Sequence, residues 1–126
     1  MEDKISKSFP LINRNIGKLK ILLFVYGFFL ILFSLLPGKI PDSTNRAIDF
    51  SDEILHFLAY FFFVLLGLFS IFKVPNKKKL VFTAFFLCIF IEVMQIYIPY
   101  RYFSIGDIVA NILGIAGALF LFKTYL

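Results

Sequence analysis

Residues 91–117 form a long apolar stretch that carries polar side chains at helical intervals. Glu92 and Gln95 are three residues apart, and Asp107 and Asn111 are four residues apart. Each pair therefore lies on one face of a helix. A proline between the two pairs interrupts the helical pattern, because proline lacks the backbone N–H that a helix interior needs. The stretch predicts two antiparallel helices, joined by a short loop, with their polar groups gathered near that loop.

The whole chain has the composition of a membrane protein. Of its 126 residues, 60% are hydrophobic, and the mean hydropathy is +0.90, whereas soluble domains are about 45–50% apolar. The first apolar run does not read as a signal peptide, because no small-residue cleavage site follows it. We expect an all-α protein, an integral membrane four-helix bundle at residues 21–126, preceded by a basic cytoplasmic segment at residues 1–20. The approximate membrane spans are residues 21–36, 54–72, 80–98 and 105–122.

The distribution of Lys and Arg predicts the orientation of these spans. Ten of the 13 basic residues lie in the N-terminal segment, in the loop at residues 73–79 and at Lys123. The other two loops carry the remaining three. Loops rich in Lys and Arg stay on the cytoplasmic side of a membrane, so both termini are expected in the cytoplasm of a bacterial cell. The net charge of +5 does not indicate nucleic-acid binding, because the basic residues flank apolar runs and form no single stripe.

Polar side chains from three predicted helices fall at similar depths below the outer surface. At a rise of about 1.5 Å per residue, His56, Tyr60, Glu92 and Asn111 all lie roughly one to two helical turns below it. We expect a polar pocket that opens to the outside and is closed towards the cytoplasm by Phe, Leu and Ile side chains. The predicted ligand-binding residues are Asp52, His56, Tyr60, Glu92, Gln95, Arg101, Ser104, Asp107 and Asn111.

Several of these residues also have purely structural explanations. Gln95 and Asn111 are suited to hydrogen bonds between membrane helices. Asp107 fits a capping box with Ser104, which would open the last helix. Arg101 is suited to anchoring the loop to lipid headgroups. Each of these residues therefore has both a structural and a functional interpretation.

Other features of the sequence indicate packing. Ala110, Gly114 and Ala118 recur every four residues, a pattern that lets membrane helices approach closely. The single cysteine, Cys88, excludes an internal disulfide and a multi-cysteine metal site. It lies within an apolar run, as a packing residue does. The His, Asp and Glu spacings match no metal-binding signature, so neither a metal nor another cofactor is predicted, although a zinc or magnesium site could still arise by tertiary convergence.

The polar residues form two motifs, Asp52-x3-His56-x3-Tyr60 and Glu92-x2-Gln95-x3-Pro99-x-Arg101-x2-Ser104-x2-Asp107-x3-Asn111-x2-Gly114. These motifs resemble those of the VanZ-like family of small bacterial membrane proteins. The family often has a basic residue where Glu53 stands in this chain. The family takes its name from a protein linked to resistance to the glycopeptide teicoplanin. The resemblance implies a multi-pass protein of the plasma membrane with a role in the cell envelope or in glycopeptide resistance.

Two classes of function are compatible with these residues. In the first, the pocket binds an envelope lipid, a lipid-linked wall precursor or an amphiphilic lipoglycopeptide, and Arg101 meets its phosphate or carboxylate. The alternative is an intramembrane acid–base enzyme that modifies a lipid headgroup or an isoprenoid phosphate, with His56, Glu92 and Asp107 as the candidate catalytic residues. Transport is a weaker third option, because nothing polar continues towards the cytoplasm. Membrane lipids are the expected partners, and the sequence does not predict the oligomeric state.

Overall fold

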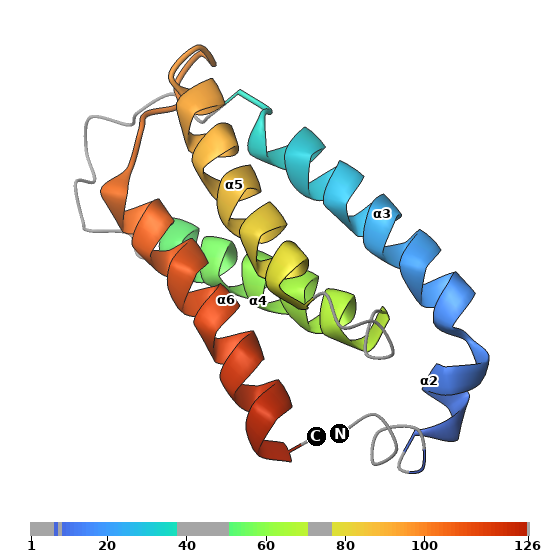
Figure 1. Cartoon of the computed structure of the whole chain (residues 1–126). Coiled ribbons are helices and arrows are strands. Elements are labelled where there is room, and N and C mark those ends of the chain that lie inside the picture. The colour runs from blue at the N-terminus through green and yellow to red at the C-terminus, as the bar shows by residue number, and fades with distance from the viewer. Residues whose placement is uncertain (1–6, 8, 38–50, 71–76, 126) are drawn as a thin grey trace.

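The computed structural model describes residues 7, 9–37, 51–70 and 77–125 of the chain (Figure 1). Within these residues the structure contains five helices and no strand, which confirms the all-α prediction. Four of the helices are long and one, α2, is a short helix of 5 residues just before α3. The helices are α2 (Pro10–Arg14), α3 (Ile16–Ser34), α4 (Ser51–Ser70), α5 (Lys77–Gln95) and α6 (Ile105–Tyr125).

Three of the described helices are long and apolar enough to cross a membrane. The spans of this kind are Ile16–Ser34, Asp52–Ser70 and Ile105–Thr124. Helix α5 is also 19 residues long, but it begins with three lysines and contains Glu92. The sequence predicted a loop at residues 73–79, but the last three lysines of that segment belong to α5. Lysine is a good helix former, which explains the difference.

Helix α5 ends at Gln95, before the end of the apolar run at residue 98. Pro99 explains the early end, because proline donates no hydrogen bond and disfavours helical geometry in the residue before it. Tight turns follow, in which the backbone N–H of Ile98 donates to the carbonyl of Gln95 (3.1 Å) and that of Arg101 donates to the carbonyl of Ile98 (3.2 Å). Tyr100 adopts a positive φ of 59° within these turns. The polar residues of α5 are thus brought directly next to those of α6.

The four long helices run alternately up and down, so that α3 and α5 are antiparallel to α4 and α6 (Figure 1). Side-chain contacts fix this arrangement: the Tyr26 hydroxyl of α3 donates to the carbonyl of Ala59 in α4 (2.9 Å). Gly67 near the end of α4 lies against Leu80 near the start of α5. In consequence α3 and α5 end, and α4 and α6 begin, at one end of the molecule, which we call the polar end.

The closest helix packing is between α4 and α6, which run parallel. Gly114 of α6 lies against the backbone of Phe57 and Phe61, and Gly117 against the Phe61 ring. Ala110 and Ala118 on the same face of α6 are buried. The close packing predicted from small residues at four-residue intervals is confirmed. It holds the start of α6 beside the start of α4.

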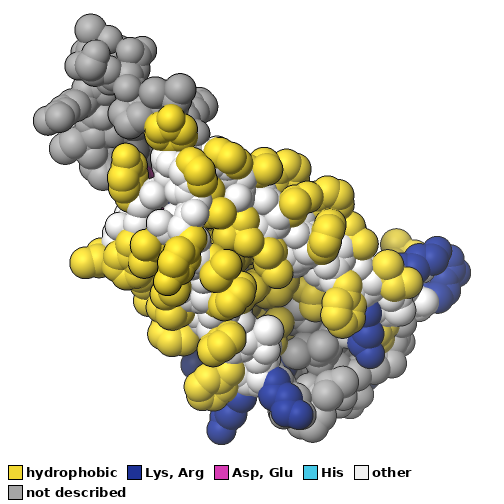
Figure 2. Space-filling model, turned by 90° about the horizontal axis from the view of Figure 1, so that it is seen from above, with side chains coloured by type: hydrophobic (Ala, Val, Ile, Leu, Met, Phe, Trp, Pro, Cys, Tyr) yellow, Lys and Arg dark blue, Asp and Glu magenta, His cyan; other side chains and the backbone are white. Residues whose placement is uncertain are grey.

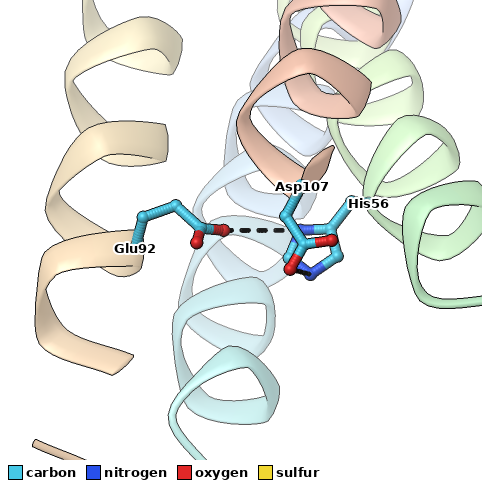
Figure 3. Close-up of side chains that lie close together, drawn as sticks. All are labelled: His56, Glu92 and Asp107. Carbon is cyan, nitrogen blue, oxygen red and sulfur yellow. Dashed lines mark ion pairs between the residues drawn. The ribbon is translucent and has the colours of Figure 1, made fainter. Parts of the chain in front are cut away.

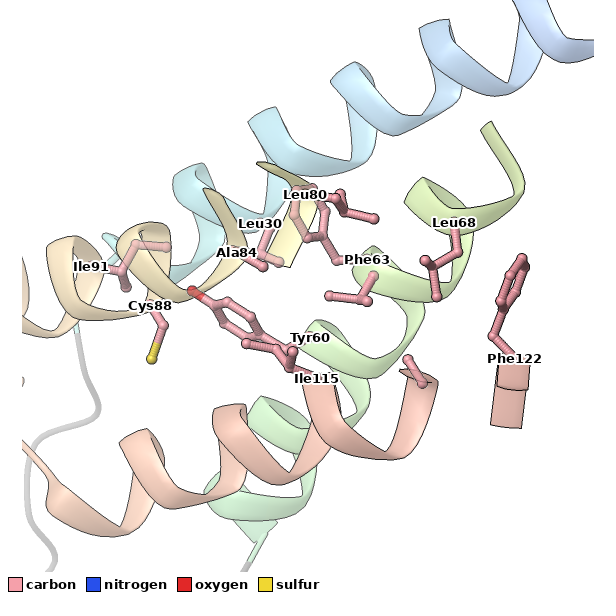
Figure 4. Packing of buried hydrophobic residues seen from close by; sticks show 12 residues of the cluster. Leu30, Tyr60, Phe63, Leu68, Leu80, Ala84, Cys88, Ile91, Ile115 and Phe122 are labelled. Atoms are coloured by element: carbon pink, nitrogen blue, oxygen red, sulfur yellow. The ribbon is translucent and has the colours of Figure 1, made fainter. Parts of the chain in front are cut away.

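The buried core lies between the helices, and the outer surface is largely apolar. Tyr60, Leu68 and Ile91 are among the large side chains that are fully enclosed (Figure 4). Large side chains such as Phe24 (81% exposed) and Phe86 (73% exposed) point outward instead. Hydrophobic side chains cover the face seen in Figure 2, and Lys and Arg side chains gather towards one end of it. An apolar surface of this extent is typical of helices that contact lipid and not of a soluble monomer.

Candidate functional site

At the polar end, the His56 ring of α4 lies between two carboxylates that come from α5 and α6 (Figure 3). Nε2 of His56 is 3.6 Å from Oδ2 of Asp107, and Nδ1 is 4.0 Å from Oε1 of Glu92. The Glu92 side chain is fully buried, and those of His56 and Asp107 are 13% and 14% exposed. Three helices thus bring an imidazole and two carboxylates together in a nearly closed space. All three residues were among those predicted from the sequence to line a polar pocket.

Asn111 orients the histidine ring from a second direction. Its Oδ1 lies 3.1 Å from Nδ1 of His56, and its Nδ2 donates to Sγ of Cys88 (3.2 Å). Both Asn111 and Cys88 are fully buried. An N–H at Nδ1 can therefore donate to the Asn111 amide oxygen, which leaves Nε2 beside Asp107. A protonated ring would donate on both sides.

Ser104 connects the Glu92 carboxylate to the first turn of α6 through its own backbone and side chain. Its Oγ accepts a hydrogen bond from the backbone N–H of Asp107 (3.2 Å), so Ser104 caps α6 as predicted. In a complete capping box, the Asp107 carboxylate would accept the backbone N–H of Ser104. Here that N–H donates to Oε2 of Glu92 instead (3.4 Å). Because Glu92 takes this role, the Asp107 carboxylate is free to face His56.

Glu92 has one oxygen that its surroundings leave unsatisfied. Oε1 is buried and has no hydrogen-bond partner among the described residues. A buried polar atom without a partner costs about 1–3 kcal/mol. Oε1 is therefore the atom of this cluster best placed to take a proton or a ligand. His56, Glu92 and Asp107 also each offer one atom that could bind a metal ion, and these atoms lie within 4.8 Å of one another.

A cavity of about 270 Å³ adjoins this cluster, and His56 belongs to both. Its wall is mostly apolar and comes largely from α3 and α4. Five of the predicted ligand-binding residues line it, whereas Glu92, Ser104, Asp107 and Asn111 lie around His56 outside the lining. The lining residues are Leu30, Phe33, Ser34, Asp52, Leu55, His56, Ala59, Tyr60, Gln95 and Arg101.

Gln95 and Arg101 attach this end of the molecule to the end of α3. Nε2 of Gln95 donates to the carbonyl of Ser34 (3.0 Å), and Nε of Arg101 donates to the carbonyl of Leu36 (3.1 Å). Gln95 therefore acts as the interhelical hydrogen-bonding residue that its position suggested. A guanidinium has further N–H donors on its two terminal nitrogens, so Arg101 can still bind an anion at the cavity.

Tyr60 and Glu53 carry two further buried polar atoms without partners among the described residues, the Tyr60 hydroxyl and Oε2 of Glu53. Tyr60 lines the cavity, as the sequence predicted. Glu53 was not among the predicted site residues, although it lies beside Gly106 at the start of α6. Sequence reasoning also missed the main-chain carbonyls of α3, because a backbone acceptor leaves no signal in the side-chain pattern. The role of Cys88 as a hydrogen-bond acceptor was missed for a related reason, since cysteine in an apolar run reads as packing.

Comparison with known proteins identifies the family. No curated protein and no solved structure gave a significant match. The model of the VanZ/LLP1 family matches residues 4–126, which is nearly the whole chain. This match agrees with the two sequence motifs and with the all-helical, apolar structure. The chain therefore belongs to the VanZ/LLP1 family.

Proposed function

We propose that this chain acts in the bacterial cell envelope by binding an amphiphilic lipid in the cavity at its polar end. The observation that carries the proposal is the composition of the cavity wall. Its wall combines apolar side chains such as Leu30 and Phe33 with the polar side chains of Arg101, His56 and Asp52. An amphiphile is bound best by a wall with both apolar and charged side chains. Its hydrocarbon chain is stabilised by apolar contacts, and its charged group by charged hydrogen-bond partners.

The charge distribution supports an outward-facing cavity. Lys77, Lys78 and Lys79 begin α5, at the opposite end of that helix from Glu92. Nζ of Lys77 lies 5.0 Å from the ring centroid of Phe122, near the end of α6. Basic residues favour the cytoplasmic side. The polar end then faces the outer leaflet of the plasma membrane, where wall precursors and glycopeptides are found.

The chemistry of the cavity restricts the class of ligand. Arg101 favours a phosphate or carboxylate, and the apolar wall favours an acyl or isoprenoid chain. A phospholipid, a lipid-linked wall precursor and a teicoplanin-type lipoglycopeptide share these two features. Binding of the drug or shielding of its lipid-linked target would each contribute to glycopeptide resistance.

Filling the cavity tests this proposal. Ala59 lines the cavity and contributes only its backbone carbonyl to the bond with Tyr26, so Ala59→Leu should narrow the cavity while leaving that bond intact. The purified protein in nanodiscs is titrated with a fluorescent isoprenyl phosphate, a fluorescent phosphatidylglycerol and a fluorescent lipoglycopeptide. We expect saturable binding of at least one probe by the wild-type protein and at least about tenfold weaker binding by Ala59→Leu, which corresponds to about 1.4 kcal/mol.

The matched control is Ala116→Leu, which adds the same side chain at an exposed position on α6. This variant should bind the probes as the wild-type protein does. If the wild-type protein saturates with none of the three probes, or if Ala59→Leu and Ala116→Leu bind equally well, the cavity is not the lipid site.

A second candidate function is chemical conversion of the bound lipid. The observation that favours it is the position of His56 between Asp107 and Glu92, with Asn111 at Nδ1. A histidine oriented in this way is suited to general acid–base catalysis. For hydrolysis of a phosphodiester, His56 would take a proton from water as the new P–O bond forms. It would return the proton to the leaving alcohol oxygen as the old P–O bond breaks.

Product analysis separates conversion from binding. The nanodisc protein is incubated with the same lipids carrying a radioactive label, and the products are separated by chromatography. Conversion predicts a product whose rate of formation has a bell-shaped pH profile and is lost in His56→Gln, while the probe still binds. Stoichiometric binding without any product between about pH 5 and 9, the range around histidine titration, would leave binding as the function.

A further inference from the structure

We propose that His56, Glu92 and Asp107 together bind one divalent metal ion at the polar end. Their candidate ligand atoms lie within 4.8 Å of one another. Metal ions such as zinc hold nitrogen and oxygen ligands at about 2.0–2.2 Å in tetrahedral geometry, which places neighbouring ligands about 3.3–3.6 Å apart. The separation of 3.6 Å between Nε2 of His56 and Oδ2 of Asp107 is at this spacing, and the Glu92 carboxylate offers a third ligand atom within 4.8 Å. Small side-chain adjustments would complete the site.

The unsatisfied oxygen of Glu92 provides an independent observation. The side chain is fully buried, and its Oε2 is held by the backbone N–H of Ser104. The other oxygen, Oε1, has no hydrogen-bond partner among the described residues and faces His56 (Figure 3). Proteins seldom leave a buried carboxylate oxygen without a partner. A metal ion bound by Nε2 of His56, Asp107 and Oε1 of Glu92 would supply one.

The charge of the cluster also favours a divalent ion. With both carboxyl groups ionised and the imidazole neutral, the cluster would carry a charge of minus two, and buried charges in proteins are generally paired or coordinate metals. A protonated His56 would neutralise only half of that charge. A divalent ion would neutralise all of it.

The residues around the cluster match those that surround metal ligands. A histidine that binds a metal usually donates its other ring N–H to a carbonyl or carboxylate oxygen. Oδ1 of Asn111 lies 3.1 Å from Nδ1 of His56 and provides that acceptor. One imidazole nitrogen and two carboxylate oxygens suit zinc or manganese better than the soft metals that prefer thiolates. Sγ of Cys88 is occupied as the acceptor for Asn111 and is not needed as a ligand.

The position of the cluster suggests a use for the ion. Three protein ligands leave coordination positions open for water or substrate. His56 also lines the cavity, so an anionic headgroup there could reach the metal. This last step rests on the proposed lipid-binding function, whereas the metal site itself does not.

Titration with cobalt tests the metal site directly, because Co²⁺ commonly replaces zinc and gives visible absorption bands when protein side chains bind it. The full chain in nanodiscs is freed of metal with a chelator, titrated with Co²⁺, and then displaced with Zn²⁺ or Mn²⁺. We expect one Co²⁺ per chain in the wild-type protein. The Glu92→Gln and Asp107→Asn variants should each bind it at least about tenfold more weakly, because changing even a residue that only supports a metal ligand costs about tenfold or more.

The control is Lys123→Gln, which removes one charge from an exposed side chain in the last turn of α6. Lys123 lies at the opposite end of α6 from Asp107, so this variant should retain Co²⁺ binding. Thermal unfolding of each variant checks that it folds. If Glu92→Gln does not fold, Asp107→Asn decides the question, because its side chain is partly exposed and tolerates the change more readily.

Two results would overturn the metal site. One is the failure of the wild-type protein to saturate with any of the three ions. The other is equal Co²⁺ affinity in the wild-type protein, Glu92→Gln and Asp107→Asn. Lipid probes added in the presence of chelator keep the two proposals separate: lipid binding without metal binding overturns only the metal site, and metal binding without lipid binding overturns only the lipid-binding function.

Discussion

Gly114 of α6 lies directly against the backbone of Phe57 in α4, so that a Cβ at position 114 would overlap the carbonyl oxygen of Phe57. The same Cβ would lie 3.0 Å from the backbone nitrogen of Phe61. Backbone atoms cannot move aside as the end of a flexible side chain can. This contact sets the separation of α4 and α6, and with it the distance between His56 and Asp107.

We predict that Gly114→Ala destabilises the protein by about 1–3 kcal/mol, the usual cost of overpacking a tight contact. The measurement is thermal unfolding in detergent. Gly17→Ala is the matched control, because a Cβ at position 17 would meet nothing within 4 Å. Alanine at that helical site should leave stability unchanged or raise it by up to about 1 kcal/mol. Equal unfolding temperatures for the two variants would show that α4 and α6 are not in close contact.

Glu92 offers a comparison between two substitutions at one buried position. Glu92→Gln keeps the shape and an oxygen acceptor for the backbone N–H of Ser104, so its stability should stay within about 1 kcal/mol of the wild type. Glu92→Leu leaves that N–H without its acceptor, which should cost about 1–3 kcal/mol. Thermal unfolding of the two variants gives this difference.

If Glu92 serves a ligand, Glu92→Gln should fold normally and yet lose metal binding and lipid conversion. A Glu92→Gln variant that folds and retains every activity would remove the carboxylate from the function. The pocket would then act through its shape alone.

Arg101 is expected to bind the anionic group of the lipid. Replacing it removes a charge-assisted hydrogen bond, which contributes about 1.5–3 kcal/mol, so Arg101→Gln should bind the fluorescent isoprenyl phosphate at least about tenfold more weakly. Wild-type binding should also weaken with added salt. Arg14→Gln is the control, because Arg14 is exposed on α2, away from the cavity. Loss of affinity in both variants would indicate a general effect of charge and no role for this cavity.

Reporter fusions test the orientation. A reporter after Lys79 or after Leu126 should report a cytoplasmic position, and one inserted between residues 41 and 47 should report an external one, because basic loops remain in the cytoplasm. The insertion site lies outside the described residues, so the experiment also covers a part of the chain that the structure does not describe. A cytoplasmic signal from that insertion would place the polar end on the inner side of the membrane.

The sequence was sufficient to predict the four long helices and the gathering of their polar residues near one end. Apolar runs and a proline indicate where helices form, and a constant rise per residue is enough to align His56, Glu92 and Asn111. The structure brings these three residues into one cluster. Helix ends were less predictable. Helix α5 begins at Lys77, three residues before its apolar run. Lysine occurs readily both in helices and in loops at a membrane surface, so its presence did not predict this start.

The hydrogen-bond partners could not be predicted. The sequence pattern of Ser104 and Asp107 predicts a reciprocal capping box, but the third partner, Glu92, comes from another helix and takes one of the two bonds. The carbonyl of Ser34 that accepts from Gln95 is part of the main chain, and any residue would have supplied it. The periodicity of polar residues predicts which face of a helix a side chain occupies. It does not predict which atom of another helix that side chain will contact.

The link between Glu92 and Ser104 has a consequence for how the protein is made. The ribosome synthesises α4, with His56, before it synthesises either carboxylate. Glu92 and Asp107 follow on α5 and α6. The backbone N–H of Ser104 reaches Glu92, and its Oγ accepts from the backbone N–H of Asp107, only when α5 and α6 fold back on each other. An unfinished chain that stops after α4 therefore carries the imidazole without its partners. The cluster of His56, Glu92 and Asp107 therefore cannot form until α6 has been synthesised and packed against α4 and α5.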